Sequence, residues 1–151
     1  MKTLKGDLLQ LALDGHFDVI VHGCNCFCRM GAGIARSIKS VFPEAFQADQ
    51  ATKEGDEKKL GSFSSATVNR NGHTITVING YTQYNSFGEG VLVDYKAVEK
   101  LFSRLKKEYG GKRIGYPKIG AGLAGGNWKK ISTIIDRELA GEDHTLVIFG
   151  P

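Results

Sequence analysis

Two glycine-rich segments constrain the fold of this chain more than any other feature of its sequence. The first, residues 31–33, follows an apolar run over 17–22 and precedes a helical pattern over 34–42. The second, residues 120–126, follows a run over 113–117 and precedes a helical pattern over 128–139. Because a strand, a tight loop and a helix in this order build parallel sheets, both segments are expected at the carboxyl ends of strands.

The rest of the chain continues this alternation of strand and helix patterns. Further strands are predicted over residues 64–70, 73–79 and 145–149, and a further amphipathic helix over 93–109. The Asn71-Gly72 pair predicts a tight hairpin turn, and Pro43 predicts the end of the helix before it. The polar stretch 51–61 predicts an exposed helix end and loop. Together these patterns indicate an α/β fold with a largely parallel or mixed sheet covered on both faces.

Length and composition limit the class of protein. At 151 residues the chain has a common size for one domain, so we expect a single domain over 1–151. An apolar fraction of 41% and a charged fraction of 24% are typical of a globular protein. No apolar run approaches the roughly 20 residues that cross a bilayer, and no signal-like segment follows Met1. We therefore expect a cytoplasmic monomer without a membrane partner.

The net charge gives only a weak indication of the partner. A formal charge of +4 suits an anion, which could be a phosphorylated small molecule or nucleic acid. Lys and Arg are scattered, and the densest groups, at 104–107 and 128–130, are typical of solvated helix faces. Nucleic-acid binding is therefore a secondary interpretation that depends on charge alone.

A glycine loop between a strand and a helix can bind an anion through its backbone amides and the positive end of the helix dipole. Neither segment here has the Gly-Lys-Ser/Thr ending of a Walker A loop or the full spacing of a dinucleotide fingerprint. Taken alone, each is as consistent with a tight turn as with a phosphate site. Two such loops that face one another could hold a diphosphate.

The residues around these loops make the pattern more specific. They are Gly6-Asp7-Leu8, residues 19–25, residues 29–35, residues 117–123 and Trp128. In this order they resemble the macrodomain family over almost the whole chain. The resemblance is closest to the branch with terminal ADP-ribose glycohydrolase, the DNA-ADP-ribose glycohydrolase of toxin–antitoxin systems and yeast-type ADP-ribose-1''-phosphate phosphatase. It implies a three-layer α/β/α sandwich with a mixed, mostly parallel central sheet.

The same resemblance implies the ligand and the residues that bind it. The partner is ADP-ribose or a derivative, including ADP-ribosylated protein or nucleic acid, and no cofactor is implied. The implied ligand-binding residues are Asp7, Leu8, Asn25, Met30, Gly31, Ala32, Gly33, Ile34, Gly120, Ala121, Gly122, Leu123, Ala124 and Phe149.

Three of these residues have a structural alternative. Asp7, after the first strand, is implied to accept a hydrogen bond from adenine, but an aspartate there could also cap a helix over 8–13. Asn25 is implied to lie near the distal ribose, or it could be a turn residue held by bonds to its own loop. Phe149 could pack on the adenosine or belong to the core.

The candidate catalytic residues are His22, Asn25 and Lys39. Residues 22–25 resemble the phosphatase segment, and His22 has a suitable ordinary pKa for proton transfer, although a histidine satisfied by hydrogen bonds is an equal alternative. Lys39 matches the nucleophilic lysine of the glycohydrolase, or it is a solvated helix lysine. Ala124 stands where that enzyme has its assisting acid, which disfavours the lysine route.

The resemblance therefore leads first to a hydrolase of ADP-ribose derivatives, with ADP-ribose-1''-phosphate phosphatase ahead of the alternatives. One alternative is removal of ADP-ribose from protein or nucleic acid, and another is a non-catalytic ADP-ribose-binding module.

The three cysteines offer a separate hypothesis. Cys24, Cys26 and Cys28 are too close together for a disulfide framework, and their odd number suits a reducing compartment. With His22 they form a zinc candidate, but structural zinc sites usually combine two separated ligand pairs. Small buried apolar residues are the preferred interpretation, and no metal is required.

Overall fold

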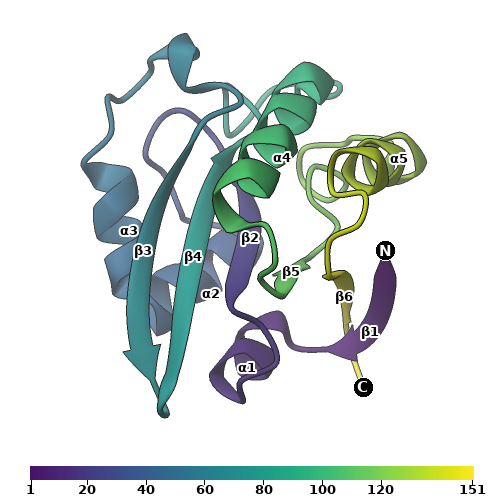
Figure 1. Cartoon of the computed structure of the whole chain (residues 1–151). Helices are drawn as coiled ribbons and strands as arrows, with labels where there is room; N and C mark the ends of the chain where they lie inside the picture. Colours follow the sequence, from purple (N-terminus) through teal and green to yellow (C-terminus); the bar gives the residue numbers. More distant parts are fainter.

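The computed structural model describes residues 1–151 and contains one six-stranded sheet with helices on both faces (Figure 1). The strands are β1 Lys2–Gly6, β2 Val19–Cys24, β3 Phe63–Arg70, β4 His73–Tyr81, β5 Ile114–Tyr116 and β6 His144–Phe149. The helices are α1 Leu8–Leu13, α2 Gly33–Val41, α3 Pro43–Gln50, α4 Tyr95–Tyr109 and α5 Trp128–Glu138, with a short 3₁₀ helix, η1, at Glu57–Lys59.

The sheet has the strand order β1-β6-β5-β2-β4-β3. Every neighbouring pair is parallel except β3 and β4, which form the antiparallel hairpin predicted from Asn71-Gly72. Asn71 and Gly72 both have positive φ, 53° and 77°, as a tight hairpin turn requires. The mixed, mostly parallel sheet predicted from the sequence is confirmed.

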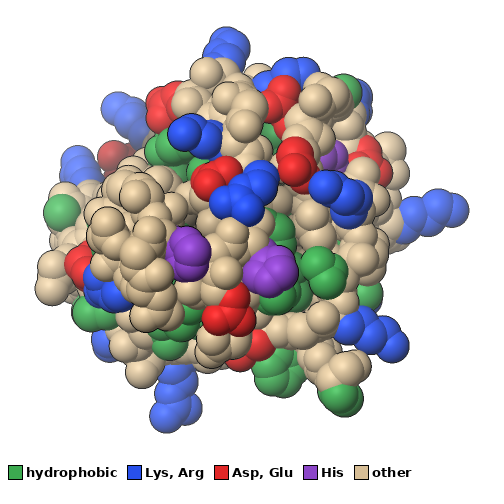
Figure 2. All heavy atoms as spheres, turned by 60° about the horizontal axis from the view of Figure 1, so that its bottom comes forward, with side chains coloured by type: hydrophobic (Ala, Val, Ile, Leu, Met, Phe, Trp, Pro, Cys, Tyr) green, Lys and Arg blue, Asp and Glu red, His purple; other side chains and the backbone are tan.

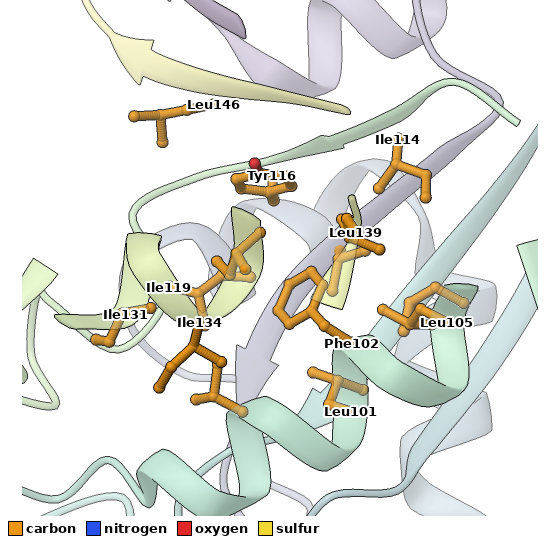
Figure 3. Close-up of a cluster of buried hydrophobic side chains, with 14 of the residues drawn as sticks. Leu101, Phe102, Leu105, Ile114, Tyr116, Ile119, Ile131, Ile134, Leu139 and Leu146 are labelled. Atoms are coloured by element: carbon orange, nitrogen blue, oxygen red, sulfur yellow. The ribbon is translucent and has the colours of Figure 1, made fainter. Parts of the chain in front are cut away.

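Side chains of β2 alternate between the two faces of the sheet and connect both helix layers. Val19 and Val21 belong to a core cluster that includes α4 and α5, whereas Ile20 belongs to a cluster with α1, α2 and α3. Figure 3 shows the first cluster, in which Phe102 of α4 lies beside Tyr116 of β5, and Ile134 of α5 belongs to the same cluster. The result is the expected three-layer α/β/α sandwich.

The sequence patterns predicted neither α3 nor β1. Pro43 does not only end α2; it also occupies the first turn of α3, where its missing N–H costs nothing. Phe42 between the two helices is fully buried and connects them to one core. Strand β1 lies at a sheet edge, and most of its residues are exposed. It therefore has no apolar run that would predict a strand, and only the family resemblance implied it.

No helix is both long and apolar enough to span a membrane.

Candidate functional site

A cleft with two compartments lies at the carboxyl ends of the parallel strands. The first compartment, about 470 Å³, is formed by both glycine loops and the end of β2. The second, about 790 Å³, is formed by the ends of β1 and β6 together with α1, α2 and part of the second glycine loop. The compartments share four lining residues, Ile34, Pro117, Lys118 and Gly122, and therefore adjoin.

The first glycine loop presents a row of free amides to this cleft. The backbone N–H groups of residues 31–35 donate no hydrogen bond within the protein. Ala32, the N-cap of α2, makes no side-chain cap bond. Gly33 has a φ of +57°, which favours glycine there. Free amides and the positive end of the helix dipole together form a site for an anion.

The second glycine loop is held closed by its own backbone. Gly126 N donates to Gly120 O at 2.7 Å, and a Cβ on Gly120 would lie 2.7 Å from Val93 Cγ2, so the close packing requires glycine. The amides of Gly122, Leu123 and Ala124 donate to no acceptor in the protein. This loop therefore offers a second set of free donors.

The two loops face one another across the first compartment. An added Cβ on Gly33 would lie 3.9 Å from Leu123 Cδ1, so the loops come into contact range at this point. Leu123 is 79% exposed because nothing else in the protein covers it. Every predicted ligand-binding residue except Met30 lines one of the two compartments.

Asp7 and Phe149 lie in the second compartment. Asp7 Oδ1 accepts hydrogen bonds from the amides of Leu9 and Gln10 at 2.9 and 3.2 Å, so the capping alternative describes a real role. Both bonds use the same oxygen, and Asp7 Oδ2 accepts none within the protein. Leu8 is buried beside it, whereas Phe149, the last residue of β6, is 84% exposed. An apolar ring and a free carboxylate oxygen thus line one compartment.

Asn25 lines the first compartment and is fixed by its own loop. Its Oδ1 accepts from the amide of Phe27 at 2.9 Å, and its Nδ2 donates to the carbonyl of Arg29 at 2.9 Å. Asn25 is therefore a turn residue held by bonds to its own loop, and it also lies on the wall of the cleft. The side-chain atoms Oδ1 and Nδ2 of Asn25 each have one hydrogen-bond partner already, but Oδ1 can accept a second hydrogen bond.

The structure does not support the catalytic role predicted for His22. Its side chain is fully buried and lines neither compartment. Its Nε2 atom lies 2.7 Å from Asn79 Oδ1. Asn79 Nδ2 donates to the carbonyl of Ala45, so Asn79 Oδ1 is an acceptor and His22 Nε2 carries the proton. Burial lowers the pKa of His22 to about 4. His22 is therefore a buried histidine whose ring is hydrogen-bonded within the protein, which was the alternative to a catalytic role.

Lys39 and Met30 also lie away from the cleft. Lys39 is exposed on α2, with Nζ 4.1 Å from the centre of the Phe46 ring on α3, and it lines neither compartment. The nucleophile prediction for Lys39 therefore has no support in the geometry. Met30 is 2% exposed and packs in the core with residues such as Ile38, so its side chain does not line the cleft.

The three cysteines point to different partners. Cys24 Sγ lies 3.5 Å from His22 Nε2, Cys26 Sγ contacts the carbonyl of Gln83 and Cys28 Sγ contacts the carbonyl of Asp49. The structure contains no group of three His, Cys, Asp or Glu side chains placed to hold a metal ion. Burial raises the pKa of Cys24 well above its ordinary value, so this thiol is unreactive.

The charges around the first compartment are all positive. Arg29 and Lys118 line it, and no Asp, Glu or His side chain does. Elsewhere the charges are mixed: on the face shown in Figure 2, basic and acidic side chains are interspersed rather than gathered in one area. Sequence reasoning missed Arg29 and Lys118, although a basic residue beside each glycine loop was a usable signal.

The fold and cleft define the class: an α/β/α sandwich with a cleft between two glycine loops whose backbone amides have no acceptor in the protein. A family model of the Macro domain matches residues 21–135. An uncharacterized 17.5 kDa protein of Enterobacteria phage T4, from its tk-vs intergenic region, is 37% identical over 142 residues, which cover 90% of this chain and 88% of the relative. The chain belongs to the macrodomain family.

Solved structures show the same fold. A protein of unknown function from Bacteroides thetaiotaomicron aligns with a TM-score of 0.80 at 22% identity, covering 99% of this chain and 98% of its own. DarTG of Thermosipho africanus, solved in complex with ADP-ribose, aligns with a TM-score of 0.72 at 19% identity, covering 100% of this chain and 42% of its own.

Proposed function

We propose that the cleft binds ADP-ribose or one of its derivatives, with the diphosphate between the two glycine loops. The observation that carries this proposal is the pair of facing loops whose amides, at residues 31–35 and 122–124, have no acceptor in the protein. A diphosphate would satisfy both rows at once, assisted by the α2 dipole. The likeness to DarTG, whose solved complex contains ADP-ribose, supports the same ligand.

The lining of the second compartment suits the adenosine. Its volume of about 790 Å³ is within the range of nucleotide-sized sites, and the exposed ring of Phe149 offers a surface on which a base can stack. Asp7 Oδ2 is a free acceptor for the adenine amino group. The distal ribose then extends past Gly122 toward Asn25 in the first compartment.

Recognition without turnover is the activity that this geometry supports best. General acid–base catalysis needs a titratable group within hydrogen-bond reach of the substrate, and the first compartment has no Asp, Glu or His side chain. The lysine route for removing ADP-ribose needs a nucleophilic lysine and an assisting acid. Lys39 is turned toward Phe46 on α3, and Ala124 stands where the acid would be, so the cleft lacks both groups.

ADP-ribose-1''-phosphate phosphatase is the second candidate. The free loop amides could stabilise charge on a phosphoryl group while water attacks phosphorus and the ribose hydroxyl leaves. This route would use electrostatic stabilisation without a side-chain base.

A ligand series and a product assay test these functions together. The protein is titrated with ADP-ribose, ADP and AMP, and then incubated with ADP-ribose-1''-phosphate and with ADP-ribosylated protein while phosphate and free ADP-ribose are measured. We expect ADP-ribose to bind more tightly than AMP, which lacks the diphosphate. Phosphate release would establish the second candidate, and equal weak binding of all three nucleotides would refute the diphosphate site.

Replacing Phe149 by Ala is expected to weaken ADP-ribose and AMP binding to a similar extent, by about tenfold, because one stacked aromatic contact is lost. The side chain is 84% exposed, so the thermal midpoint should not change. Calorimetric titration of both variants measures the effect. An unchanged AMP affinity would show that the base does not lie on Phe149.

Replacing Lys39 by Ala is expected to leave ligand affinity and any turnover unchanged, because Nζ packs on Phe46 outside the cleft. The same titration and product assay measure both quantities. Loss of deribosylation in a variant with normal affinity would restore the nucleophile hypothesis.

A further inference from the structure

A second cluster of polar side chains lies outside the cleft. It brings together the loop after β2, the end of α3, the short helix η1 and the last residue of β4. Hydrogen bonds and close contacts join its members, which are Cys28, Asp49, Thr52, Lys59 and Tyr81. None of these residues lines either compartment, so the proposed binding of ADP-ribose uses none of them.

Lys59 places a buried positive charge in this cluster without an ion pair. It is 8% exposed, and its Nζ donates a hydrogen bond to Thr52 Oγ1 at 2.9 Å, but no carboxylate pairs with it. Asp49 Oδ1 instead accepts from Tyr81 OH at 2.7 Å, and Asp49 Oδ2 has no hydrogen-bond partner. Burial raises the pKa of Asp49, which weakens it as a counter-ion. A negative charge formed close to Nζ would therefore stabilise this buried ammonium.

Cys28 is a group within reach of Lys59 that can become negative. Its Sγ lies 3.7 Å from Lys59 Nζ. Its φ of 56° is in the left-handed region, and Gln50 Nε2 donates to its carbonyl at 2.6 Å, so the backbone is held in this conformation. Cys24 and Cys26 are buried, whereas Cys28 is only partly buried. A partly exposed thiol fixed beside a cation is typical of a reactive cysteine.

We propose that Cys28 is a modification site for hydrogen peroxide, at which the Lys59 ammonium stabilises the negative charge on sulfur. The thiolate attacks one peroxide oxygen, so that an S–O bond forms, the O–O bond breaks and hydroxide leaves. Sulfur is oxidised by two electrons and the peroxide is reduced. Lys59 protonates the hydroxide to water and regains from solvent the proton that the thiol released. The products are a Cys28 sulfenic acid and one water, whatever the cleft binds.

Trapping with dimedone, which labels sulfenic acids, tests this assignment. The protein is treated with hydrogen peroxide in the presence of dimedone, and tandem mass spectrometry gives the rate of labelling at each cysteine. Lys59→Met removes the charge but keeps an unbranched apolar chain. Lys58→Met is the matched control, because Lys58 is an exposed lysine of the same η1 without a side-chain hydrogen bond. Glutathione is the reference thiol, and thermal unfolding checks the fold of each variant.

We expect the label on Cys28 and not on the buried Cys24 or Cys26, at a rate about tenfold above that of glutathione. Lys59→Met should reduce this rate about tenfold, and Lys58→Met should leave it unchanged. A purely structural role for Lys59 leads to the opposite change, because loosening η1 would expose the thiol and accelerate labelling. Labelling of wild-type Cys28 no faster than glutathione, or an unchanged or faster rate in Lys59→Met, overturns the inference. If Lys59→Met does not fold, the wild-type comparison with glutathione decides the question.

Discussion

The Gly122→Glu variant is expected to stay folded and to lose ADP-ribose affinity by more than about 100-fold. Gly122 lines both compartments, and a Cβ added there meets no atom within 4 Å. Its φ is not in the left-handed region, so a larger residue introduces no backbone strain. The new carboxylate would lie in the diphosphate position, where like-charge repulsion costs several kcal/mol. Calorimetric titration measures the loss of affinity, and thermal unfolding checks the fold.

Two further variants separate charge from bulk and strain. Gly122→Ala adds only a methyl group into open space, and its affinity should fall by less than about threefold. Gly33→Glu should also abolish binding, but its φ of +57° makes a lower thermal midpoint part of the expectation. If the folded Gly122→Glu variant keeps its affinity for ADP-ribose, the diphosphate does not bind beside Gly122.

Acidification is expected to destabilise the protein through His22. Burial lowers the pKa of His22 from 6.5 to about 4 in the folded protein, while the unfolded chain keeps the ordinary value. Between these values the unfolded state binds the proton and the folded state does not, so stability falls as the pH falls. Above pH 6.5 His22 has no such effect. The shift corresponds to about 3 kcal/mol of unfolding free energy between pH 7 and pH 4.

Comparison with His22→Gln isolates this contribution, because other groups titrate in the same range. Glutamine can still donate a hydrogen bond toward Asn79 Oδ1 but does not titrate. Urea unfolding of both proteins at several pH values should show that the variant loses less stability on acidification. Parallel pH profiles would mean that His22 is protonated in the folded state, in conflict with its burial.

Much of the fold could be predicted because its signals are local. The Asn71-Gly72 turn, the apolar strands and the amphipathic helices each depend on neighbouring residues, and so do the two glycine loops. Their meeting in one cleft followed from a topological rule: loops after adjacent parallel strands share an edge of the sheet. β2 and β5 are indeed neighbours.

The features that sequence patterns did not show depend on tertiary contacts. Sequence shows that a histidine ends a strand, but not that Asn79 from β4 and Ala45 from α3 complete its hydrogen bonds. Lys39 matched a helix position, yet the packing of α3 turns it toward Phe46. The start of α3 at Pro43 was missed because the same residue can end one helix and begin another.

A crystal structure of the complex with ADP-ribose tests the central claim most directly. The account predicts phosphate oxygens within about 3 Å of amides from both residues 31–35 and residues 122–124, with the adenine against Phe149. A ligand whose diphosphate contacts only one loop, or lies outside the cleft, would contradict it.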